Sequence, residues 1–169
     1  AAIWKLPVVY LCENNLYAMG TALARSESQT DIQAKAAAYA VRAAAVDGMD
    51  VFAVESAVRH AAEHARAGRG PALLELRTYR FRAHSMFDAQ LYRDKAEIAE
   101  WREKGPIVRF QGWLLENVLI HEADITKMTT EIDAEIVEAV AFAEAGEWEP
   151  VETLTKHVMS ADLASPPAV

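Results

Sequence analysis

Two stretches of the sequence hold side chains that could do chemistry. The first contains Asn14 and Asn15, shortly after the apolar run 8–11, which we expect to form a strand buried on both faces. An asparagine oxygen is a hard, neutral donor that suits Mg²⁺ or Ca²⁺, and open α/β sheets bind ligands just beyond the carboxyl ends of their strands. On local grounds alone, an Asn-Asn pair is more often a turn closed by bonds from side chain to backbone, so both interpretations stay open here.

The second stretch is 80–92, which is aromatic, basic and polar and has no clear period. Histidine is the side chain best able to transfer protons near neutral pH, so His84 is a candidate for acid–base chemistry, although a lone loop histidine is usually just exposed. Ser85 beside it lacks the GxSxG context of a nucleophile. Together with Arg77 just before the stretch, Arg80 and Arg82 could bind an anion, or they could pair with acidic residues from the second half of the chain.

A third pattern, His60-x-x-Glu63-His64, fits the letters of a zinc peptidase motif. Its two histidines share one face of a predicted helix, but no third ligand is evident, so we interpret this face as polar and solvated. The sequence has no GxGxxG and no GxxxxGK[ST] motif, which removes the usual sequence evidence for a nicotinamide or nucleoside triphosphate site.

The elements that must position these residues alternate between strand and helix. We expect an alanine-rich helix over 31–45, an amphipathic helix over 51–67 and a second strand over 72–79. A strand, a helix and a second strand form a right-handed parallel unit, so the predicted fold class is α/β, a parallel sheet flanked by helices. Further helices are expected over 94–103, 107–117 and 124–145, followed by an extended or frayed stretch over 147–169.

Composition narrows the classes of function. The chain has 169 residues, of which 52% are hydrophobic and 25% charged, as in an ordinary globular domain with one core. The net charge of −8 is uneven, because residues 1–92 carry +1 and residues 93–169 carry −9. The acidic second half argues against a nucleic acid partner, and no apolar run approaches the length of a membrane span. The single cysteine, Cys12, excludes an intramolecular disulfide and fits a reducing compartment.

Five blocks of sequence, in order, carry a family resemblance. They are AAIWKLPVVYLCENNLYAMGT, QTD, VDGMDVFAV, GRGPALLELRTYRFRAHSM and LYR. Together they resemble the alpha subunit of the thiamine-diphosphate-dependent 2-oxo acid dehydrogenase family, with the members that act on pyruvate or acetoin nearest. The resemblance is close over 1–110 and looser beyond.

The resemblance implies the family's thiamine-diphosphate-binding fold. Residues 1–92 would be the C-terminal part of the diphosphate-binding α/β domain with its active-site loop, and 93–169 would be a helical extension of the same domain. It also implies thiamine diphosphate and Mg²⁺ as cofactors, with the side-chain oxygen of Asn15 and the backbone carbonyl of Tyr17 on the metal. The family's metal motif begins with Gly-Asp-Gly, so we expect the aspartate ligand upstream of Ala1 and the chain to be an N-terminally truncated piece.

The same resemblance implies roles in the active-site loop. His84 would face the reactive end of the cofactor and assist acyl transfer, and Ser85 matches a position that is phosphorylated in some mitochondrial relatives. Ala83, Phe87 and Ala89 depart from the Gly, Ser and Pro that are usual in the family.

The implied activity is oxidative decarboxylation of pyruvate with acyl transfer to lipoamide, and acetoin or a branched-chain 2-oxo acid is the alternative substrate. The implied partners are a beta subunit in an α₂β₂ heterotetramer and the lipoyl domain of an acyltransferase. An alternative of another class is a non-catalytic assembly subunit or an inactive fragment, and the isolated chain is expected to be inactive. The expected compartment is the bacterial cytoplasm, or the mitochondrial matrix in a eukaryote.

Overall fold

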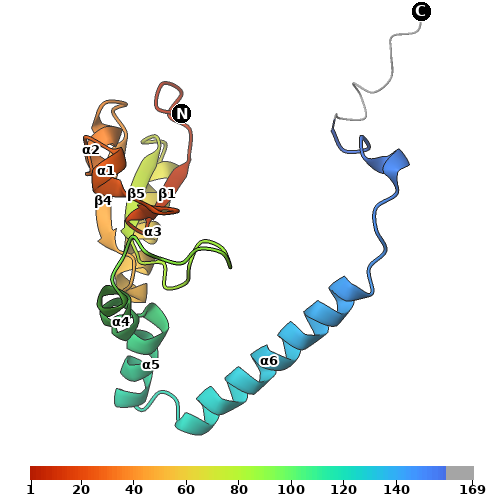
Figure 1. The fold of residues 1–169 in the computed structure, drawn as a ribbon. Coiled ribbons are helices and arrows are strands. Elements are labelled where there is room, and N and C mark those ends of the chain that lie inside the picture. The colour runs from red at the N-terminus through yellow and green to blue at the C-terminus, as the bar shows by residue number, and fades with distance from the viewer. Residues whose placement is uncertain (159–169) are drawn as a thin grey trace, which may run out of the picture. The chain divides into compact units, whose positions relative to one another are not determined.

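A three-stranded parallel sheet organises the first part of the chain. The computed structural model describes residues 1–158, so the part of the predicted extended stretch from 159 onward lies outside the described residues. The strands are β1 (Val9–Asn14), β4 (Arg42–Asp47) and β5 (Ala72–Arg77), in the order β1-β5-β4, with β5 in the middle (Figure 1). The predicted parallel α/β fold is therefore confirmed.

Helix α3 (Val51–Arg66) covers one face of this sheet. The core between them consists of Ala61 on the helix and of Ala72, Leu74 and Leu76 on the middle strand. Successive side chains of a strand point to opposite faces, so these three residues of β5 face α3 while Leu73 and Glu75 face the other way. The prediction of an amphipathic helix over 51–67 is confirmed.

The prediction of one helix over 31–45 is wrong in its second half. Helix α2 (Ile32–Ala37) ends after six residues, the chain turns through Ala40 at φ 53°, and β4 begins at Arg42. Alanine favours a helix locally, but Arg42–Asp47 pairs along its whole length with β5. The ladder of parallel hydrogen bonds therefore overrides the local preference.

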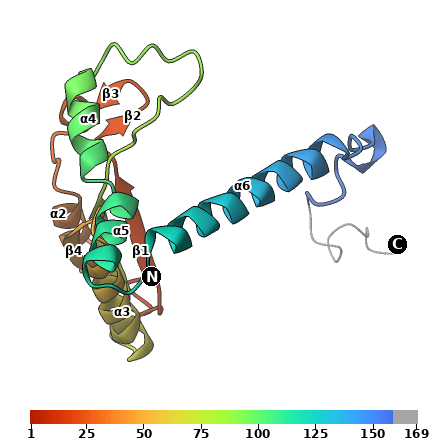
Figure 2. The same ribbon diagram turned by 90° about the horizontal axis from the view of Figure 1, so that it is seen from below.

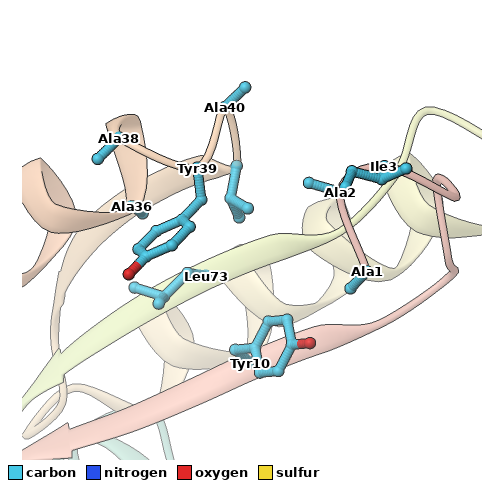
Figure 3. A pocket seen from close by; sticks show the side chains of 10 residues that line it. Ala1, Ala2, Ile3, Tyr10, Ala36, Ala38, Tyr39, Ala40 and Leu73 are labelled. Atoms are coloured by element: carbon cyan, nitrogen blue, oxygen red, sulfur yellow. The ribbon is translucent and has the colours of Figure 1, made fainter.

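The prediction that the first strand is buried on both faces is also wrong in the described structure. β1 lies at an edge of the sheet, where Tyr10 is 45% and Leu11 53% exposed. Figure 3 shows Tyr10 and Leu73 beneath Tyr39, with Ile3 beside Ala2 across an apolar cavity of about 630 Å³ on the face opposite α3. An edge strand has a neighbouring strand on one side only, so its side chains are covered less than those of the middle strand β5.

A small hairpin follows β1. It consists of β2 (Tyr17–Ala18) and β3 (Thr21–Ala22), and the short helix α1 (Leu23–Ser26) continues from it. Beyond β5, a long loop leads into α4 (Lys95–Glu103) and α5 (Pro106–Glu116), both close to their predicted bounds.

Helix α5 packs against the start of α3. The ring of Phe52 contacts those of Phe110 and Trp113, at centroid distances of 5.6 and 4.7 Å. Arg109 donates to Asp47 at 2.9 Å and to Asp50 at 3.0 Å. These contacts join the helix to the carboxyl end of β4.

The contacts divide the chain into two compact units, and the division falls after Leu119. This division groups α4 and α5 with the sheet, and the functional division into 1–92 and 93–169 stays a prediction. The second unit contains α6 (Glu122–Glu144) and the 3-10 turn η1 (Val151–Thr153). The predicted long helix is confirmed, and the apolar residues Met128, Ile132 and Ile136 along it are about half exposed. Among the described residues, no helix combines the length and the apolar character needed to cross a membrane.

The N-cap of α3 gives a first prediction. Asp50 accepts hydrogen bonds from the backbone N–H groups of Phe52 at 2.9 Å and Ala53 at 3.2 Å. Asp50→Ala should lower the free energy of unfolding by about 1–2 kcal/mol, because two N–H groups at the helix start lose their acceptor. Urea unfolding followed by circular dichroism measures this change. Asp50→Asn keeps a capping oxygen but loses the charge that faces Arg109, so an equal loss in both variants would contradict the capping explanation.

Candidate functional site

The polar turn after β1 is closed by its own side chains. Asn14 accepts a hydrogen bond from Leu16 N–H at 3.1 Å, and Asn15 accepts one from Tyr17 N–H at 3.1 Å. Two consecutive turns of this kind place Leu16 at φ 70°, a left-handed conformation that costs free energy for a residue with a side chain. The turn therefore needs support from its surroundings.

That support comes from the neighbouring strand. Asn14 donates from Nδ2 to Oε1 of Glu75 at 2.8 Å, and its backbone carbonyl accepts from Thr78 N–H at 2.9 Å. The side chain of Glu75 is only 1% exposed. Both contacts follow from the parallel register, in which Cys12 lies opposite Glu75 and Asn14 opposite Arg77. The carboxyl ends of β1 and β5 thus meet at the turn.

The hairpin after the turn packs against the long loop 78–94. The ring of Tyr17 lies 5.5 Å from that of Tyr92 and 6.4 Å from that of Tyr79. The guanidinium of Arg93 lies 5.4–6.0 Å from the centroids of all three rings. A cation over aromatic faces is attracted by their electron density, so Arg93 holds the loop against the hairpin. Figure 2 shows the loop as a green arch between the sheet and α4, beside β2 and β3.

Close packing at Gly20 supports the same contact. A Cβ atom added there would lie 3.3 Å from the ring of Tyr92, so the absence of a side chain lets the hairpin approach the loop. Tyr17 also donates from its hydroxyl to Glu97 of α4 at 3.2 Å. The hairpin is therefore held by the loop and by the helix that follows it.

The loop itself is ordered by Asp88. Its carboxylate accepts from the backbone N–H of His84 at 3.1 Å, from Gln90 N–H at 2.9 Å and from the hydroxyl of Tyr92 at 2.8 Å. Arg80 donates to the carbonyls of Arg82, Ala83 and His84. Arg93 in turn donates to the carbonyl of Arg80. A continuous set of hydrogen bonds thus runs from the hairpin contact to His84.

The charge states of these groups follow from their surroundings. Burial raises the pKa of Tyr79 to about 12, and the Glu97 carboxylate acts in the same direction. Burial also raises the pKa of Tyr17 above its usual value. Both phenols therefore stay neutral near pH 7 and face Arg93 as π systems. Hydrogen bonds from Gln90 N–H, the Tyr92 hydroxyl and His84 N–H lower the pKa of Asp88 below its ordinary 3.8, so this carboxyl is ionised near neutral pH.

The candidate residues predicted from the sequence lie in the turn, in the hairpin and in the loop. Asn15 and Tyr17 are half-buried in the turn and the hairpin, and His84 is exposed in the loop. The contacts of Arg93 and Arg80 link the hairpin that contains Tyr17 to the segment that contains His84. His84 takes part in hydrogen bonds through its backbone, and among the described residues none reaches its ring. Ser85 is exposed beside it.

The two histidines of the HxxEH pattern lie elsewhere. His60 bonds to the backbone carbonyl of Ser56 at 2.7 Å, and His64 is contacted by Arg42 and Arg69. Within residues 1–158, no group of three His, Cys, Asp or Glu side chains is arranged to hold a metal ion.

Three residues of the site were missed by reasoning from the sequence. Glu75 lies in an apolar strand, Asp88 in an irregular loop, and Arg93 just before a helix cap. A charged residue inside the run ALLEL was a usable signal, because an ionised group is rarely buried without a partner. The contact of Arg93 with three tyrosines left no local signal, because the rings come from separate segments.

Comparison with known proteins adds an independent finding. The family described as "Dehydrogenase E1 component" matches residues 1–160. A pyruvate dehydrogenase E1 component subunit alpha of Rhizobium meliloti is 41% identical over 146 residues, covering 86% of this chain and 42% of the relative. The somatic mitochondrial E1 alpha subunit of Homo sapiens is 39% identical over 164 residues, covering 96% of this chain and 42% of the relative. A chloroplastic E1 alpha-3 subunit of Arabidopsis thaliana is 41% identical over 145 residues and is covered over 34% of its length. The chain thus spans less than half the length of these relatives.

The contacts of Asp88 generate a second prediction. Asp88→Ala removes the acceptor for two backbone N–H groups and the Tyr92 hydroxyl, so residues 84–92 should lose hydrogen-exchange protection at pH 7. Because the pKa of Asp88 is lowered in the folded state, the ordering it provides is present above pH 3.8 and is lost as pH falls through the lowered pKa. Protection factors in this segment should therefore fall in acid in the wild type but show no such step in Asp88→Ala.

Asp94→Ala is the matched control for this experiment. Asp94 is a nearby carboxylate that caps α4 by accepting from Ala96 N–H at 2.9 Å. Its loss should affect the start of α4 and leave the protection of 84–92 unchanged. Equal protection of that segment in wild type and Asp88→Ala would contradict the ordering role of Asp88.

Proposed function

The chain belongs to the dehydrogenase E1 component family, and on that premise we propose that it is part of the alpha subunit of a pyruvate dehydrogenase. The proposed reaction is the oxidative decarboxylation of pyruvate with transfer of the acyl group to lipoamide. The names of the three relatives favour pyruvate over acetoin or a branched-chain 2-oxo acid. The observation that carries the proposal is the polar turn at the carboxyl edge of the sheet, held against a loop that contains His84.

The oxygen donors of the turn suit a hard cation. Asn15 is half-buried, and its side-chain oxygen uses one lone pair to accept from Tyr17 N–H. An amide oxygen has two lone pairs, so one is left for a metal ion. We propose that this oxygen and the backbone carbonyl of Tyr17 bind Mg²⁺. Two oxygens are fewer than the six that Mg²⁺ takes, so a diphosphate and further oxygens would complete the shell.

Thiamine diphosphate, when bound, would supply the carbanion-stabilising chemistry that the side chains of the chain lack. The residues of the chain would bind and orient it through Mg²⁺ at the turn. His84 would hold and move a proton as the acyl group passes to the lipoyl group, since an imidazole can do so near neutral pH. The hydrogen bonds of Asp88 and Arg80 to the backbone of His84 would fix its place in the loop.

The exposed tip of the loop supports a role in partner binding. Met86, Phe87 and Leu91 are each more than 90% exposed. Apolar side chains gathered on one loop are typical of a surface that another protein covers. We propose that this tip meets the lipoyl domain and that a beta subunit completes the site in an α₂β₂ assembly. The proposed compartment is the bacterial cytoplasm, or the mitochondrial matrix in a eukaryote.

A non-catalytic assembly role is the competing function. It is distinguished by calorimetry with thiamine diphosphate and Mg²⁺ on the full-length subunit assembled with its partner. Tight, Mg²⁺-dependent binding supports the catalytic proposal, and the absence of binding supports the assembly role. The isolated 169-residue chain is expected to be inactive, because it supplies only two of the proposed metal ligands.

The metal role of Asn15 gives a third prediction. In the assembled enzyme, Asn15→Ala should raise the Mg²⁺ concentration needed for half-maximal thiamine diphosphate binding by about 100-fold, since even supporting residues around a metal are worth 10–100-fold. Titration calorimetry measures this shift. An unchanged Mg²⁺ requirement would rule out Asn15 as a ligand.

The role of His84 gives a fourth prediction. His84→Ala should keep part of the decarboxylation measured with an artificial electron acceptor, while acylation of the lipoyl domain falls by about 100-fold or more, the contribution typical of acid–base catalysis. His60→Ala, which changes an exposed histidine on α3, is the matched control and should leave both rates unchanged. Normal lipoyl acylation by His84→Ala would show that His84 has no such role.

A further inference from the structure

Glu75 is the one fully buried carboxylate among the described residues, and its position is costly. Its side chain is 1% exposed, in the middle of the central strand. Oε2 has no hydrogen-bond partner within the described part of the chain, and Arg77 reaches Oε1 only at 3.4 Å. Burying a charged group without full compensation costs free energy. An apolar residue like its neighbours Leu74 and Leu76 would avoid that cost, so the carboxylate calls for an explanation other than stability.

The hydrogen bond between Glu75 and Asn14 indicates why a carboxylate occupies this position. Oε1 accepts from Nδ2 of Asn14 at 2.8 Å, while the other end of the same amide, Oδ1, accepts from Leu16 N–H at 3.1 Å. The Asn14 amide is therefore held at both ends. Only one orientation of this amide gives each end a partner, because the backbone N–H of Leu16 can only donate and must therefore face the amide oxygen.

The fixed amide determines the geometry of the turn. By accepting from Leu16 N–H, Asn14 stabilises the left-handed backbone at Leu16, where φ is 70°. Leu16 lies between Asn15 and Tyr17, so its backbone angles set the direction of the Asn15 side chain relative to the Tyr17 carbonyl. A residue that holds Leu16 in place thus controls how the two oxygens converge.

We propose that Glu75 is a positioning residue for the cation site of the turn, and that it acts through Asn14 to preset the geometry of the Asn15 and Tyr17 oxygens. The inference rests on the proposed function, because it takes Mg²⁺ as the cation at this turn. Residues that hydrogen-bond to the groups around a metal orient its ligands before the metal binds. They raise the affinity for the metal, because the ligands no longer have to be ordered on binding.

The test compares two substitutions of Glu75 in the full-length subunit assembled with its partner. Glu75→Gln keeps an oxygen that accepts from Asn14, whereas Glu75→Met fills a similar volume without an acceptor. The readout is the Mg²⁺ concentration for half-maximal thiamine diphosphate binding, measured by calorimetry without turnover. We expect Glu75→Met to raise it about tenfold or more, and Glu75→Gln to stay close to the wild type.

Asp50→Ala is the control for general loss of stability. Asp50 caps α3 and makes no contact with the turn among the described residues, so its loss destabilises the fold without changing the turn. It should leave the Mg²⁺ requirement unchanged. An equal shift in Asp50→Ala and Glu75→Met would overturn the proposal in favour of a structural role for Glu75.

Asn14→Ser tests the same contact from the other side. A serine hydroxyl can still accept from Leu16 N–H, but the donor that reaches Glu75 is gone. Asn14→Ser should raise the Mg²⁺ requirement like Glu75→Met, and the two changes combined should add little further, as expected for residues that act through one contact. If Glu75→Met does not fold, Asn14→Ser alone is the test. A raised Mg²⁺ requirement then supports the positioning role, and an unchanged requirement overturns it.

The outcomes separate this inference from the proposed function. A wild type that binds thiamine diphosphate with Mg²⁺, together with unshifted Glu75→Met or Asn14→Ser, overturns the positioning role and leaves the proposed function standing. A wild type without Mg²⁺-dependent binding overturns both.

Discussion

The parallel pairing of β5 with strands on both of its sides is the constraint on which the rest of the first unit depends. Its register places the carboxyl ends of β1, β4 and β5 at one edge of the sheet. There the backbone of Thr78 bonds to Asn14 and that of Gly48 to Arg77. The two turns that leave this edge are therefore fixed by the same strand. One leads into the candidate site, and the other leads into the cap of α3.

Two sets of interactions hold the site, one at the turn and one in the loop, and they differ in how far solvent can reach them. The turn is held by hydrogen bonds to a strand and to a carboxylate whose side chain is 1% exposed. The loop is held by cation–π contacts and by hydrogen bonds, of which those to the backbone around His84 are exposed. Water competes with the second set more strongly, so we expect the loop to open at lower free energy than the turn. Such a difference between turn and loop would suit the proposed transfer of an acyl group to another domain.

Local reasoning succeeded where the residues themselves set the structure. Asp50 caps α3, as its residue type and its place in the sequence indicate. The observed bounds of the helices α3, α4, α5 and α6 are close to the predicted ones. The signals for these bounds are local, since they are residues at the helix ends and, in the longer helices, the spacing of apolar residues. The place of Asn14 and Asn15 at the end of a parallel strand was also predicted, and so was the irregular loop around His84. The family resemblance, carried by five sequence blocks, is confirmed by the match over residues 1–160.

The sequence by itself determined the fold class, the helices with strong caps, the family and the candidate residues Asn15, Tyr17 and His84. The tertiary structure decided that Arg42–Asp47 is a strand, since its pairing with β5 depends on residues distant in the chain. It likewise decided the contacts of Glu75 with Asn14 and of Arg93 with three tyrosines. Burial and pairing are properties of what surrounds a residue in space, and a local preference such as that of alanine for helix is too weak to withstand a full ladder of strand hydrogen bonds.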